Sequence, residues 1–218
     1  MDWKNFSGTS GNPFLPLYPS SENSPAIPGF RPRVAAIVKF QQVFYVLDSL
    51  YRLLWIGGDW DDFAAENLGG AARASRVLGT NLMDHVAGTE AQEVMADILN
   101  DVQETKRSFR MEYRCDSPEQ RRDMRMTVTP MRHDRLMVTH DLRDARSLPA
   151  VGPGWRWEKG AWDCKCSFCG FLRRTDGWVD PFETGLRHPE VVDYGVCPTC
   201  RQVIAKELER IRKAGRAG

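Results

Sequence analysis

Apolar and charged side chains alternate along three segments in the middle of the chain, which are 109–115, 124–128 and 136–140. A period of two residues is typical of a β-strand that buries one face and exposes the other. The pattern therefore predicts three strands. Their large apolar side chains are expected to form the inner face of a sheet and to fill its core; they are Met111, Tyr113, Met124, Met126 and Val138.

Helical spacing precedes these strands. Val94, Ile98 and Val102 recur every four residues, so we expect a helix from 90 to about 105. Thr89 is the expected N-cap, because its hydroxyl oxygen can accept a hydrogen bond from an N–H of the first turn.

A hairpin and a short helix are expected nearer the start of the chain. Residues 44–48 and 52–56 have the composition of paired strands. Asp59 or Asp61 is a candidate cap for a short helix that runs through Ala65. Two strands, short helices, a longer helix and three strands together predict an α+β domain, with an antiparallel sheet and helices on one side.

Composition changes along the chain divide it into four parts. Proline and polar residues dominate the beginning, and Pro and Gly recur in the stretch 146–154. The expected parts are a disordered tail (1–30), the sheet domain (31–145), a linker (146–161) and a cysteine module with a C-terminal helix (162–218).

Composition and charge exclude several classes of protein for this chain. The chain has 42% hydrophobic and 27% charged residues, which is typical of a soluble globular protein, and its net charge of +1 gives no general attraction to nucleic acid or membrane. The sequence shows no signal-peptide pattern and no apolar run near the ~20 residues that a spanning helix needs. We therefore expect a cytoplasmic protein without a membrane partner.

Four cysteines lie in two Cys-x2-Cys pairs, Cys166 with Cys169 and Cys197 with Cys200. Each pair can place two thiolates on one edge of a tetrahedron, as structural zinc requires. Four thiolates leave no open coordination position, so we expect the zinc to be structural rather than catalytic. Cys164 is either a spare thiol or a replacement for one ligand. Disulfides in a secreted protein are the alternative, and the paired spacing favours zinc.

Other polar residues have an ordinary interpretation and a functional alternative. His85, His133 and His140 are expected to be surface or core residues, with haem or metal ligation as the alternative. The arginines of the sheet region are expected on its polar face, with binding of an anionic ligand as the alternative; they are Arg110, Arg114, Arg121, Arg122 and Arg125. On the first interpretation, an Arg122→Glu change should leave the stability nearly unchanged.

The segment after the second cysteine pair has the pattern of a basic amphipathic helix. Val203, Ile204, Leu208 and Ile211 form its apolar stripe. We expect the stripe to pack on the zinc module and the basic side chains to be solvated. Contact with nucleic acid is the alternative, because basic helices can follow phosphates.

Residues 43–144 resemble a PAS domain. The element order carries the resemblance, together with the segments 43–48, 54–58 and 77–82, and the segment 114–126 resembles a bacterial PAS subgroup. PAS domains are sensor and interaction modules, and many of them dimerise. The resemblance therefore implies a homodimer that signals through a protein partner.

A second resemblance covers about 166–211. The two cysteine pairs, Trp178 between them and the helix that follows are similar to the treble-clef-like zinc tails of bacterial signalling proteins. Those tails carry a Ser-His-Gly step before the second pair. Asp193-Tyr-Gly stands there in this chain, so the role of that histidine is not implied.

We find no strong catalytic motif in the sequence. We therefore expect a non-enzymatic intracellular module that senses a signal or binds a protein partner. The alternatives are a transcriptional regulator that contacts DNA through the zinc module and basic helix, and a small enzyme that uses the PAS-like cavity. Chelation should unfold residues beyond about 162 and leave the sheet domain folded. Deletion of residues 31–42 should yield a monomer.

Overall fold

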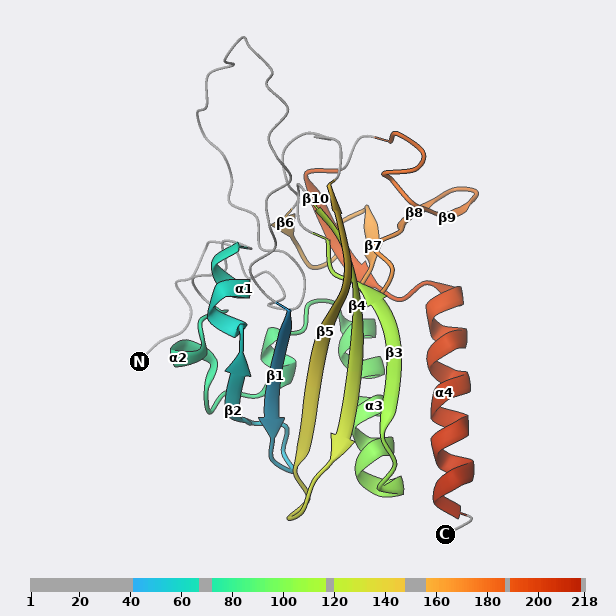
Figure 1. Ribbon diagram of the computed structural model, residues 1–218. Helices are drawn as coiled ribbons and strands as arrows, with labels where there is room; N and C mark the ends of the chain where they lie inside the picture. The colour runs from blue at the N-terminus through green and yellow to red at the C-terminus, as the bar shows by residue number, and fades with distance from the viewer. Residues whose placement is uncertain (1–40, 67–71, 117–119, 148–155, 187–188, 217–218) are drawn as a thin grey trace.

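A computed structural model describes residues 41–66, 72–116, 120–147, 156–186 and 189–216 (Figure 1). The predicted disordered tail lies outside these residues. The first part of the described chain contains the elements β1 (Gln42–Leu47), β2 (Leu53–Gly58), α1 (Trp60–Glu66), α2 (Ala74–Val77), the 3-10 helix η3 (Leu82–His85), α3 (Thr89–Thr105), β3 (Phe109–Arg114), β4 (Gln120–Pro130) and β5 (Leu136–Ser147).

The five strands of this part form one antiparallel sheet in the order β2-β1-β5-β4-β3. The predicted α+β class and antiparallel sheet are thus confirmed. Figure 1 shows α3 lying behind the sheet. Strands β4 and β5 are longer than the alternation predicts, and the end of β5 takes in the first two residues of the predicted linker.

The second part builds a smaller sheet and a helix. Its elements are β6 (Arg156–Trp157), β7 (Cys164–Cys166), β8 (Leu172–Arg174), β9 (Gly177–Val179), β10 (Val191–Gly195) and α4 (Pro198–Arg216). The strand order is β6-β10-β7-β8-β9, and β10 runs parallel to both of its neighbours. Strand β6 lies within the predicted linker, of which residues 148–155 are outside the described part. The proposed division into domains stays a prediction.

The inner face of the first sheet forms the centre of the hydrophobic core. Met111, Met124, Met126 and Val138 are buried and Tyr113 is half-buried, so the predicted inner face is confirmed. The same cluster of buried side chains continues into the second part through Phe168 and Val196. The two parts therefore share apolar contacts.

Helix α4 packs differently from the prediction. Ile204, Leu208 and Ile211 are buried in the shared core, whereas Val203 is largely exposed. The helix lies against α3 and β3 rather than on the small sheet (Figure 1). The spacing thus identifies the stripe correctly, but the surface that it covers is formed by α3 and β3.

The start of α3 also differs from the prediction by one residue. The helix begins at Thr89, and its N-cap is Gly88, which has a φ of +87°. A Cβ atom at Gly88 would lie 2.2 Å from the carbonyl oxygen of Tyr194 in β10. Glycine fits here because it tolerates both the positive φ and this close approach.

Two of the arginines expected on the polar face are buried. Arg114 and Arg122 are only 7% and 2% exposed. The guanidinium of Arg122 lies 5.9 Å from the centre of the Phe63 ring in α1. Reversing the charge of a buried guanidinium costs stability, so the expectation that Arg122→Glu would be nearly neutral is wrong.

Candidate metal centre

The first cysteine pair lies on a tight turn after β7. The N–H of Gly170 donates to the carbonyl of Cys166 at 3.0 Å, and the N–H of Cys166 donates to the carbonyl of Phe171 at 2.8 Å. Gly170 has a φ of +75°, which lets the chain reverse directly after Cys169. The turn thereby presents both sulfur atoms on the same side.

The second pair lies where β10 passes into α4. Parallel pairing places Gly195 of β10 opposite Cys166 of β7. Cys197 follows immediately, and Cys200 lies in the first turn of the helix. The N–H of Cys197 donates to Cys166 Sγ at 3.4 Å, so the two turns are joined by a hydrogen bond to sulfur.

The four sulfur atoms form one compact group. The Sγ atoms of Cys166, Cys169, Cys197 and Cys200 all lie within 4.8 Å of one another. The Cys169 and Cys197 sulfurs are 3.7 Å apart and are not joined in a disulfide. A tetrahedron with Zn–S bonds of ~2.3 Å has edges of about 3.8 Å. The spacing thus suits a tetrahedral metal ion, and the predicted ligands are brought together.

The surroundings of Cys166 favour its thiolate form. Hydrogen bonds from the Cys169 and Cys200 thiols lower the pKa of the Cys166 thiol, and burial opposes them. Metal ions bind the thiolate, so these bonds favour the state that coordinates. Cys166 and Cys197 are buried, whereas Cys169 and Cys200 are half-exposed.

Cys164 is a spare thiol in this arrangement. It does not belong to the group of four sulfurs within 4.8 Å. A Cβ atom on Gly195 would lie 3.0 Å from its sulfur, so the thiol packs against β10. Burial raises the pKa of Cys164 to about 11, which keeps the thiol protonated at neutral pH.

A buried charge cluster lies between the centre and the first sheet. Arg114 Nη2 is 2.5 Å from a carboxylate oxygen of Asp116, and Arg114 Nη1 also pairs with Asp180, which follows β9. All three side chains are at least nine-tenths buried. The backbone N–H of Arg114 donates to the carbonyl of Phe168, inside the first cysteine turn, at 2.6 Å. Sequence patterns missed this cluster, because Arg114 occupies a position of its strand at which the alternation predicts an exposed polar side chain.

No model of a known protein family and no curated protein matches this chain. In the part of the chain that the structure describes, no helix is both long and apolar enough to cross a membrane.

Of the histidines in the described residues, none belongs to the metal centre. Within the described residues, the cysteine group is the one cluster found with the spacing of a metal site. His140 is buried in the sheet core, where Tyr113 Oη lies 2.8 Å from its Nδ1 and Tyr45 Oη lies 3.4 Å from its Nε2. His85 is half-buried beside Thr80. His133 is exposed in the β4–β5 turn.

Burial of His140 predicts a loss of stability in acid. Desolvation lowers its pKa from 6.5 to about 4. Between these two pH values, His140 binds a proton in the unfolded chain but not in the folded chain. The free energy of unfolding therefore falls as the pH falls from about 6.5 toward 4. By linkage, we expect about 2–3 kcal/mol less free energy of unfolding at pH 4.5 than at pH 7 from this residue.

The test is urea unfolding at both pH values for the natural protein and for His140→Gln. The glutamine does not titrate, so the variant should lose less stability between pH 7 and 4.5 than the natural protein loses. Equal losses in both proteins would contradict the assignment of the effect to His140.

Proposed function

We propose that the protein is a non-enzymatic regulatory module that contains one structural zinc ion and acts by binding another protein. Four thiolates would complete a tetrahedral shell, which leaves no position at the metal for a substrate or an activated water. We favour zinc because it commonly binds four thiolates in a tetrahedron. An iron–thiolate site is the alternative with the same geometry. Iron would give a coloured protein, and zinc would not.

We further propose that the first sheet domain is a PAS-like sensor domain and the second part a treble-clef-like zinc module. Support comes from the order of elements, which is the order on which the resemblance rests. It also comes from the two cysteine turns, the second of which leads into a helix.

The observation that carries the proposed interaction is the apolar outer face of the first sheet, on the side opposite its core. Trp55 on the edge strand β2 is 66% exposed. Its cross-strand partner Val46 lies opposite Met137 of β5 but is only 8% exposed, so Trp55 is the exposed anchor of this face. The ring of Phe44 extends over Gly57 on the same face. Exposed tryptophans are frequent anchors of protein interfaces.

We propose that a second copy of the chain covers this outer face. Beside the apolar residues, the face carries charges of both signs, as in the pair between Arg125 and Glu112. A face of this kind can meet its own copy around a two-fold axis without like-charge repulsion. The net charge of +1 opposes self-association only weakly.

The oligomeric state of a charge-introducing variant tests this proposal. Trp55→Glu would place a carboxylate within the proposed interface, so the dimer should dissociate into monomers at micromolar concentration in analytical ultracentrifugation. Trp162→Glu is the matched control, because Trp162 is 94% exposed and lies on the small module, and it should remain dimeric. A natural protein that sediments as a monomer at high concentration contradicts the proposal.

Contact with DNA through α4 stays the alternative prediction. Several basic side chains of this helix form ion pairs within the chain: Arg201 with Glu90, Arg210 with Glu207, Arg212 with Asp101, and Lys213 with Glu209. Such pairs reduce the positive potential that phosphate binding uses. The arrangement therefore favours the protein-interaction proposal.

A further inference from the structure

We propose that metal occupancy of the four-cysteine centre regulates the sheet domain, by controlling how firmly the start of α3 and the end of β3 are held. The inference rests on the proposed metal centre and goes beyond a structural role for it. In this view the bound ion joins the two cysteine turns, and each turn holds one element of the sheet domain. Removal of the ion would separate the turns and loosen both elements.

The first cysteine turn is attached to the end of β3. The N–H of Arg114 in β3 donates to the carbonyl of Phe168, which lies between Cys166 and Cys169. The Phe168 ring is buried in the core that both parts share. Movement of this turn would therefore break a main-chain hydrogen bond of β3 and withdraw an aromatic ring from the core.

The second cysteine turn is attached to the start of α3. A carboxylate oxygen of Glu90 accepts a hydrogen bond from the N–H of Val196 at 2.9 Å and lies 3.0 Å from Arg201 of α4. These two residues flank Cys197 and Cys200. Gly88 at the N-cap of α3 touches the backbone of β10, as described above. The first turn of α3 is thus held by the segment that supplies two ligands.

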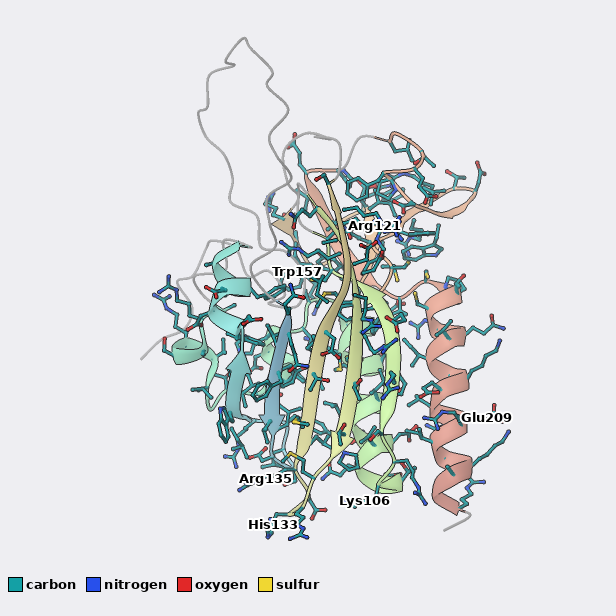
Figure 2. All side chains as sticks on the ribbon, viewed as in Figure 1. Lys106, Arg121, His133, Arg135, Trp157 and Glu209 are labelled. Atoms are coloured by element: carbon teal, nitrogen blue, oxygen red, sulfur yellow. The ribbon has the colours of Figure 1, made fainter. Side chains whose placement is uncertain are left out.

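Both attachments lie at the same end of the sheet domain. Helix α3 leads through a short turn into β3, so the start of the helix and the end of the strand are neighbours. Figure 2 shows Arg121 near this end, whereas His133 and Arg135 mark the opposite end. The ion would join a turn bound to β3 and a turn bound to α3. Its loss releases both, while the opposite end keeps its own contacts.

Hydrogen exchange of the intact 218-residue chain tests this inference. The zinc-loaded protein is compared with protein treated with a chelator under reducing conditions. We expect exchange to rise at least about tenfold at residues 92–95, the first hydrogen-bonded amides of α3, and at 112–116, and to change less than about twofold at residues 126–138 near the opposite end.

A variant separates the effect of the Glu90 contact from metal binding itself. Glu90→Ala removes the attachment of the second turn but none of the four thiols, so it should still bind about one zinc per chain. Its residues 92–95 should exchange rapidly with zinc present and change little when zinc is removed. Glu93→Ala is the matched control, because this glutamate is exposed on the same helix, and it should behave like the natural protein.

Three outcomes would overturn the inference. Exchange at 92–95 and 112–116 could be insensitive to metal removal, or it could rise equally at 126–138, which would indicate general unfolding. Glu90→Ala could also respond to metal as the natural protein does. In each case the metal centre itself would stand. Natural protein that binds no metal would instead overturn the proposed metal centre.

Discussion

Replacement of Cys197 with serine should abolish stoichiometric metal binding and lower the free energy of unfolding by several kcal/mol. Structural zinc sites contribute their binding energy to folding. Cys197 is buried between the two turns, and its N–H bonds the Cys166 sulfur. A serine hydroxyl is a poor ligand, and it leaves three thiolates close together without a full shell.

Elemental analysis and urea unfolding of the variant provide the measurements. Cys164→Ser is the matched control, because it changes a buried thiol of the same module that lies outside the four-sulfur group. The control should retain about one metal ion per chain and lose roughly 1 kcal/mol. Metal retention by Cys197→Ser, or equal metal loss in both variants, would refute the assigned ligand set.

Replacement of Arg114 with methionine should destabilise the protein by about 3–5 kcal/mol. The guanidinium pairs with Asp116 and Asp180, and all three side chains are buried. Removal of Arg114 would leave two buried carboxylates with only the more weakly placed cations Arg121 and Lys165, which costs far more than the original pairs contribute. The loss should appear as a lower midpoint in urea unfolding with an unchanged slope.

Arg156→Met is the control for this experiment. Arg156 forms an ion pair with Glu158, and both side chains are more than half exposed. Exposed pairs contribute about 0–1 kcal/mol, so this variant should be nearly as stable as the natural protein. Equal effects of the two substitutions would show that burial of the Arg114 cluster is not what stabilises the joint between the two parts.

Local patterns in the sequence predicted most elements of the first sheet and the cysteines that come together, but none of the strands β6 to β10. Alternation located β3, β4 and β5, since a two-residue period follows directly from strand geometry. The spacing of Cys166, Cys169, Cys197 and Cys200 was informative because a tight turn brings two sulfurs together regardless of the rest of the fold. Both signals arise within a few residues of the chain.

The errors concern contacts between distant parts of the chain. Arg114 occupies a polar phase of its strand, yet the small module covers it and supplies Asp180 as a partner. Thr89 has the better N-cap side chain, but the approach of Tyr194 requires glycine at position 88. The α4 stripe gives no sign of which surface it covers. Such contacts depend on how two modules meet, which periodicity does not encode.

The parallel pairing of β7 with β10 has a consequence for biosynthesis. Cys197 follows Cys169 by 28 residues, so a growing chain exposes the first two thiols well before the second two. Domains fold as they emerge from the ribosome. An ion captured early would have an incomplete shell, and the nascent sheet domain would lack the apolar cover that α4 supplies. If the proposed metal centre is present, metal insertion and burial of this surface are therefore expected to be late, coupled steps of synthesis.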